Sequence, residues 1–175
     1  PEFEEGDNEI RVRSRTELEL QEGLYRSLTI GSRSTVYLTG GSYVFDSIEM
    51  QNRSRLVFNG PTEIKIKTKM NTANDVVICP NPDSDLSAVD LIVYVEGVNG
   101  RNGSISENPK AVNIGSDNIF RVNIYAPNGT VQVRNRTEFE GSIISKDIWL
   151  GSNVEITFNG TFFLQDFDGA IADGK

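Results

Sequence analysis

The apolar and polar positions of residues 28–38 recur in residues 48–58, twenty residues further along the chain. Each stretch alternates apolar and polar residues, turns at a polar Arg-Ser corner, and then alternates again. Alternation with a period of two is typical of a half-buried β-strand, whereas an amphipathic helix repeats about every 3.6 residues. The pattern therefore predicts pairs of short strands joined by corners, and the twenty-residue spacing favours a solenoid.

A third copy of the pattern precedes these two, at residues 12–20. When the three corners are aligned, apolar residues fall into shared columns, of which Leu18, Val36 and Leu56 form one. In a parallel β-helix each strand pairs with its equivalent one coil away, at about 4.8 Å. We therefore expect an all-β chain folded as a single parallel β-helix (β-solenoid) of the right-handed kind. Its coils should be about 18–20 residues long, with enough chain for about seven to nine of them.

The repeat defines the expected domain and its interruptions. Residues 10–165 are predicted to form the β-solenoid domain, after a cloning scar and acidic lead-in at residues 1–9 and before a polar C-terminal tail at residues 166–175. Proline and turn-forming residues at 80–85, and glycine, asparagine and serine at 97–110, interrupt the strands. Such compositions do not sustain a ladder of strands. Both segments are predicted to project as loops, either as recognition surfaces or as plain connections.

The second half of the chain carries a more specific pair of strings. Residues 124–131 read Ile-Tyr-Ala-Pro-Asn-Gly-Thr-Val, and residues 139–148 read Phe-Glu-Gly-Ser-Ile-Ile-Ser-Lys-Asp-Ile. They resemble a signature of β-helical domains in PilX-like and minor pilin proteins of type IV pili, and similar strings occur in choice-of-anchor A adhesin-like domains. The resemblance covers roughly residues 112–160. It implies an extracellular, non-enzymatic recognition or adhesion module, with cell-surface or pilus components as partners.

Composition narrows the possible chemistry. The formal charge of −8 disfavours a general nucleic-acid binder, although it leaves room for a local basic patch. The chain has no histidine and one cysteine, Cys79, which excludes histidine-dependent catalysis, an internal disulfide and a cysteine zinc cluster. No apolar run approaches the roughly 18 residues of a membrane span. We expect no metal, no cofactor and no membrane insertion of this segment.

Four arginines occupy the corner position of the repeat: Arg15, Arg33, Arg53 and Arg136. Like charges one strand spacing apart repel by on the order of 1 kcal/mol per pair even in water, so something should offset the repulsion. One explanation is an anionic polymer, DNA or an acidic glycan, that follows the guanidinium groups. The other is internal, because Glu17 and Glu138 each follow two residues after an arginine and the side chains can splay into solvent.

Trp149 is the remaining candidate for ligand contact. It alternates with Ile148 and Leu150, which should point inward, so the indole is expected to face outward, where it could stack on a sugar or cover the sheet.

A parallel β-helix is compatible with two other functions. A polysaccharide-active β-helix enzyme would need a pair of carboxylates in a cleft, and the spacing shows none, so no catalytic residue is predicted. A self-assembling bactofilin-like scaffold is disfavoured by the two irregular segments.

Overall fold

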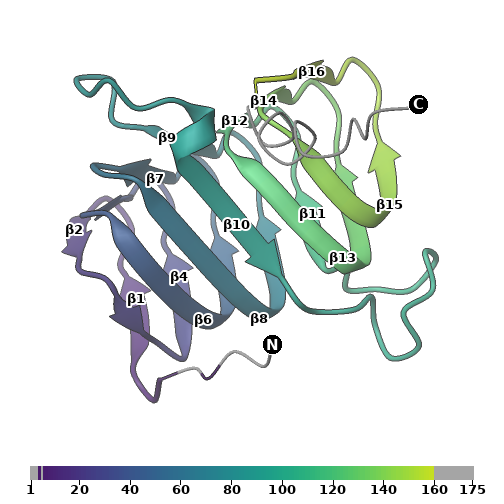
Figure 1. Cartoon of the computed structure of the whole chain (residues 1–175), viewed down its shortest axis with the longest axis horizontal. Helices are drawn as coiled ribbons and strands as arrows, with labels where there is room; N and C mark the ends of the chain where they lie inside the picture. The colour runs from purple at the N-terminus through teal and green to yellow at the C-terminus, as the bar shows by residue number, and fades with distance from the viewer. Residues whose placement is uncertain (1–3, 5, 160–175) are drawn as a thin grey trace, which may run out of the picture.

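The computed structural model describes residue 4 and residues 6–159, where nearly all regular structure is β. The strands form one sheet of nine and one of seven, and every pairing described is parallel. Figure 1 shows successive coils stacked side by side along the molecule. The predicted all-β parallel solenoid is confirmed. Residues 1–3 and 5 of the expected lead-in, residues 160–165 of the expected domain and the expected tail lie outside the described residues.

The nine-stranded sheet contains β1 (Glu9–Val12), β3 (Gly23–Leu24), β4 (Ser27–Ile30), β6 (Gly41–Met50), β8 (Thr62–Thr72), β10 (Leu91–Val95), β11 (Val112–Ile114), β13 (Asn123–Val133) and β15 (Ile143–Leu150). The seven-stranded sheet contains β2 (Glu17–Leu20), β5 (Thr35–Leu38), β7 (Arg55–Phe58), β9 (Val77–Pro80), β12 (Ile119–Arg121), β14 (Glu138–Glu140) and β16 (Glu155–Thr157). One short 3₁₀ helix, η1 (Ala88–Asp90), precedes β10.

The strand register defines about seven coils. One column, with a residue from each coil, consists of Ile10, Leu28, Ile48, Met70, Val112, Val131 and Ile148. Successive members lie 17 to 22 residues apart, close to the predicted coil length, with one exception. Met70 and Val112 are separated by 42 residues, because both predicted loops fall between them.

The long strands bend between two faces of the solenoid. In β6, Tyr43 and Val44 pair with β3, whereas the second half of the strand, 47–50, pairs with β4. Register shifts between Phe45 and Ser47 in β6 accompany this bend. Each full coil therefore has three strand-bearing faces. The polar Arg-Ser corner lies between β4 and β5 and recurs between the equivalent strands of the other coils.

Inward side chains stack as the sequence predicts. Leu18 is in register with Val36, and Val36 with Leu56, in the seven-stranded sheet. The same column continues to Phe120 and Phe139, whose rings stack with centroids 6.1 Å apart. From Val36 to Phe139 these side chains are at most 2% exposed. Removal of such apolar surface from water, at about 25 cal/mol per Å², is the main stabilising term of the stack.

The corner itself is held by buried hydroxyl groups. Ser34, Ser54 and Thr137 are at most 1% exposed. Ser34 Oγ donates to the carbonyl of Arg13, and Ser54 Oγ to that of Gln51, both at 2.6 Å. Short hydroxyl side chains recur here because they satisfy carbonyls that the turn leaves without a strand partner. Within the described chain, every buried side-chain nitrogen and oxygen has a hydrogen-bond partner.

Both predicted loops leave the solenoid within the same long coil. The first follows β9 and returns through η1, and the second connects β10 to β11; Figure 1 shows them projecting in different directions. Asn99 anchors the second loop. Its fully buried side chain accepts the backbone N–H groups of Ala111 and Thr130 through Oδ1, at 3.1 and 2.9 Å. The predicted positions of the loops are therefore confirmed, and the second loop is tied to the stack.

Candidate anion-binding groove

One residue at the corner of each coil has a left-handed backbone. In the described range, the non-glycine residues with positive φ are Arg15, Arg33, Arg53, Asp75, Asp117, Arg136 and Asn153, with φ between 56° and 62°. The backbone N–H of each of the first six donates to the next coil, as Arg15 does to Ser32 and Arg33 to Asn52. We call this row of residues the corner column. The structure places all four predicted arginines in it.

Arginine is an unusual residue for this backbone. The left-handed conformation costs an L-residue roughly 1–2 kcal/mol through contact of Cβ with the following carbonyl. Asparagine and aspartate tolerate the conformation best, and they occupy the column at Asp75, Asp117 and Asn153. Backbone conformation thus accounts for the aspartates and the asparagine. It does not account for the arginines, whose presence in the column must reflect a role of their side chains.

Along the corner column three arginines are followed by two aspartates and then by a fourth arginine. Asp75 and Asp117 stand between Arg53 and Arg136, so the predicted arginine ladder covers three coils and ends at Arg53. Arg53 Nε lies 3.8 Å from Asp75 Oδ2. Arg136 contacts Asp117 more closely, with Nε and Nη2 donating to the two carboxylate oxygens at 2.6 and 2.7 Å. These hydrogen bonds hold the pKa of Asp117 below its ordinary value of 3.8 and raise the pKa of Arg136.

Arg15 and Arg33 have no such partner. No ion pair or side-chain hydrogen bond joins either guanidinium group to any residue that the structure describes. Glu17, the expected internal partner, forms no ion pair with Arg15, and Glu138 forms none with Arg136. Both arginines are exposed. Adjacent coils therefore present two uncompensated cations at about one strand spacing, near 4.8 Å.

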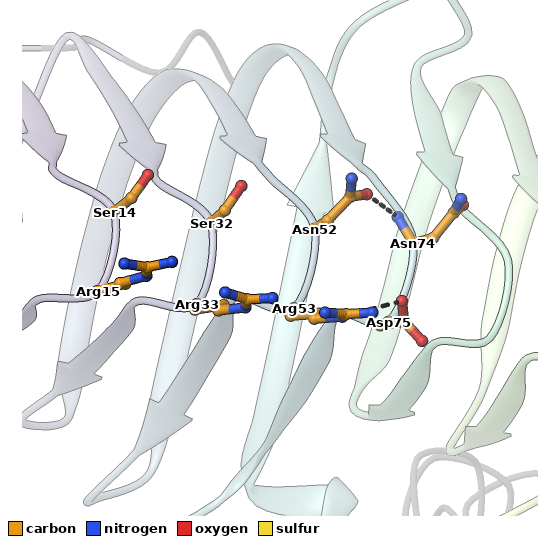
Figure 2. Close-up of a pocket in the computed structure, with 8 residues that line it drawn as sticks. All are labelled: Ser14, Arg15, Ser32, Arg33, Asn52, Arg53, Asn74 and Asp75. Carbon is orange, nitrogen blue, oxygen red and sulfur yellow. Dashed lines mark hydrogen bonds and ion pairs between the residues drawn. The ribbon is translucent and has the colours of Figure 1, made fainter.

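These arginines line an open groove of about 620 Å³, which we call the arginine groove. Its lining residues are Ser14, Arg15, Ser32, Arg33, Asn52, Arg53, Asn74 and Asp75. Figure 2 shows the three guanidinium groups following one another in a row that ends at Asp75. A second row beside them holds the two serines and the two asparagines. The groove thus crosses four successive coils.

Hydrogen bonds orient the asparagines of the groove. Asn52 Oδ1 accepts the backbone N–H of Asn74 at 3.0 Å, and Asn74 Oδ1 accepts that of Ser116 at 2.9 Å. Because the amide oxygens are occupied, the amide nitrogens remain as donors; in Figure 2 the nitrogen of Asn52 points away from the chain. Among the groove's lining residues Asp75 carries the one carboxylate. Guanidinium, amide and hydroxyl donors in such a row can bind carboxylate, phosphate or sulfate groups.

Asn74 and Asp75, which end the groove, do not stand out in the Arg-Ser repeat, because their corner contains neither arginine nor serine. A signal was nevertheless present, because Asn74-Asp75 follows Asn52-Arg53 by 22 residues and aspartate shares the tolerance of asparagine for left-handed backbone.

Trp149 lies away from the arginine groove. In β15, Trp149 is in register with Gln132, while Ile148 and Leu150 are in register with the buried Val131 and Val133. This register places the indole on the outward face, as the alternation predicted. Ile148 and Leu150, expected to point inward, are nevertheless 47% and 48% exposed, close to the 49% of Trp149. Among the described strands β15 pairs with β13 alone, so the end of the described stack leaves all three side chains exposed. The structure does not bring Trp149 and the arginines into one site, since Trp149 is absent from the groove lining.

Other features bearing on chemistry are few. Cys79 is buried, and burial raises the pKa of its thiol. The described residues hold no cluster of three or more histidine, cysteine, aspartate or glutamate side chains that could bind a metal ion. Nor does any helix in the described range have the length and apolar character to cross a membrane.

Comparisons with protein-family models, with curated proteins and with solved structures find no match to this chain. The likeness of residues 112–160 to pilus-associated and adhesin-like domains stays a prediction from the sequence. The structure defines the class as a parallel β-solenoid, and the arginine groove is the feature from which a function can be argued.

Proposed function

We propose that this chain is a non-enzymatic recognition module that binds an extended anionic polymer along the arginine groove. The proposal rests on Arg15 and Arg33, which lie on adjacent coils without an acidic partner among the described residues. Acidic residues outnumber basic ones by 25 to 17, yet the corner column provides carboxylates only beside Arg53 and Arg136. An external anion would offset the repulsion between the unpaired guanidinium groups, which is on the order of 1 kcal/mol per pair in water.

The solenoid suits the groove to an extended ligand. Backbone hydrogen bonds between successive corners hold Arg15, Arg33 and Arg53 in a row, at about 4.8 Å per coil. Because this spacing exists before binding, little conformational entropy of the backbone is lost when a polymer bridges the arginines. The polymer would lie along the stack, with its acidic groups facing successive coils.

The resemblance of residues 112–160 to pilus-associated domains supports an extracellular location at a cell surface or pilus, with components of that surface as partners. The two loops offer further contact area, since loops on a rigid scaffold commonly carry binding residues. Protease treatment of intact cells tests the location. Digestion of the chain supports surface exposure, whereas protection until the cells are lysed contradicts it.

Matched double variants test the binding function. Arg15→Asn/Arg33→Asn removes both unpaired cations and retains a residue type that the column already accepts at Asn153. Arg134→Asn/Arg136→Asn removes the same charge outside the groove. Retention would be measured on immobilised heparin, polygalacturonate and single-stranded DNA at low and physiological salt. We expect the unaltered chain and the Arg134/Arg136 variant to be retained on at least one matrix and the Arg15/Arg33 variant to elute early. Equal elution of all three proteins contradicts the proposal.

A further inference from the structure

Building on the proposed function, we infer that the polymer is a carboxylated glycan, a chain of uronic acid residues. The inference rests on a second groove beside the first. This amide groove, of about 460 Å³, is lined by Thr29, Ser32, Glu49, Met50, Gln51, Asn52, Asn71 and Ala73. Because Ser32 and Asn52 line both grooves, the two form a continuous surface across the corner.

Hydrogen bonds fix the polar side chains of the amide groove. Asn71 Nδ2 donates to Glu49 Oε2 at 2.8 Å, and Glu49 Oε1 also lies 3.3 Å from Lys69 Nζ. Ser32 Oγ donates to Gln51 Oε1 at 3.3 Å. Amides and hydroxyls both donate and accept hydrogen bonds, and a carboxylate accepts them, which matches the hydroxyl groups of a sugar ring. A ligand lying across the corner would meet guanidinium groups on one side and amides on the other.

Nucleic acid fits this surface less well. Among the residues that the structure describes, no aromatic side chain lines either groove, so a base would find no stacking platform there. Double-stranded DNA carries one charge per roughly 1.7 Å of axis, whereas the arginines are about 4.8 Å apart. Phosphates in excess of the arginines would face a protein of net charge −8.

A uronic acid chain matches the arginine groove in group chemistry. It carries one carboxylate per sugar ring. Guanidinium groups bind carboxylates through two parallel hydrogen bonds. The protein uses this geometry itself between Arg136 and Asp117. With carboxylates bound at arginines of the groove, the ring hydroxyls would face the side chains of the amide groove across Ser32 and Asn52.

The test is calorimetric titration of the full chain, in buffer containing a chelator, with oligogalacturonate, its methyl ester, a heparin oligosaccharide and an oligothymidylate of matched charge. We expect oligogalacturonate to bind, the uncharged ester to bind at least about tenfold more weakly, and Arg15→Asn/Arg33→Asn to lose about tenfold or more in affinity. Gln51→Ala should weaken oligogalacturonate binding a few-fold and leave any binding of oligothymidylate unchanged. Unfolding curves would verify that each variant folds.

The possible failures are distinguishable. If heparin or oligothymidylate binds in an Arg15- and Arg33-dependent manner and oligogalacturonate does not, the proposed function stands and the glycan inference is overturned. If the methyl ester binds as tightly as the acid, the carboxylate is not recognised and the inference is again overturned. If no probe binds in an arginine-dependent manner, the proposed function fails as well.

Discussion

Arg136 donates two hydrogen bonds, at 2.6 and 2.7 Å, to Asp117, which occupies the same corner position one coil earlier. Arg15 and Arg33 cannot form such a pair within the corner column, because each is followed by another arginine and Arg33 is also preceded by one. One backbone position therefore holds a neutralised cation near the C-terminal end of the described solenoid and uncompensated cations near the N-terminal end. The proposed groove rests on this contrast.

Arg33→Asn should be at least as stable as the unaltered chain. The substitution relieves an arginine in left-handed backbone, an unfavourable conformation by roughly 1–2 kcal/mol, and removes repulsion from two neighbours. Urea unfolding measures the change, for which we expect a gain between zero and about 1 kcal/mol. Asn153→Arg, the reverse exchange in the same column, should lower stability. A clear loss on Arg33→Asn would show that the arginine has a structural role.

Asp117→Asn should make the free energy of unfolding less dependent on pH in the acidic range. The folded-state pKa of Asp117 lies below 3.8, so its ionised form stabilises the fold above that ordinary value, and the stabilisation is lost as pH falls through the lowered pKa. The variant should therefore be less stable at neutral pH and equal to the unaltered chain in strong acid. Urea unfolding at a series of pH values measures this. Asp83→Asn is the control, and a stability difference independent of pH for Asp117→Asn would contradict the pairing.

Leu56→Ala should destabilise the stack by about 2–5 kcal/mol, the range for large apolar side chains lost from packed cores. Leu56 is 1% exposed and is in register with Val36 on one side and Ile78 on the other. Glu17→Ala, on an outward position of β2, should change stability by less than about 0.5 kcal/mol. Similar values for the two variants in denaturant unfolding would be inconsistent with the column of inward residues.

Asn99→Ala should loosen the second loop. It removes the acceptor of two buried backbone N–H groups, those of Ala111 and Thr130, and an unsatisfied buried donor costs about 1–3 kcal/mol. We expect faster amide hydrogen exchange at both residues and over 97–110, with a smaller effect on β5 and β7. Asn102→Ala, in the exposed part of the same loop, serves as control. Unchanged exchange at Ala111 and Thr130 would argue against the anchor.

Much of the fold could be predicted because inward residues at adjacent coils are in register. The column of Leu18, Val36 and Leu56 is visible in the sequence since alternation and a near-constant period coincide there. The period fails between Met70 and Val112, where two loops fall within one coil. Asp75 lies before the two loops and Asp117 after them, which is why their shared place in the corner column was not apparent from the repeat.

The partners of the corner arginines could not be predicted from the sequence for a different reason. Spacing along the chain suggested Glu17 and Glu138 as partners, since residues i and i+2 of a strand share a face. The left-handed backbone at Arg15 and Arg136 breaks that alternation at the corner. The acceptor that Arg136 finds lies 19 residues earlier in the chain and one coil away in space. Contacts between coils, rather than along one strand, decide which arginines are neutralised.

Nuclear magnetic resonance titration of the isotopically labelled chain with heparin oligosaccharide and with oligogalacturonate tests the central claim most directly. The account predicts that backbone and Nε–H signals of Arg15, Arg33 and Arg53 shift with at least one of these polyanions, while those of Arg136 stay in place. Shifts confined to Trp149 or to the loops, or no shifts with either polyanion, would contradict it.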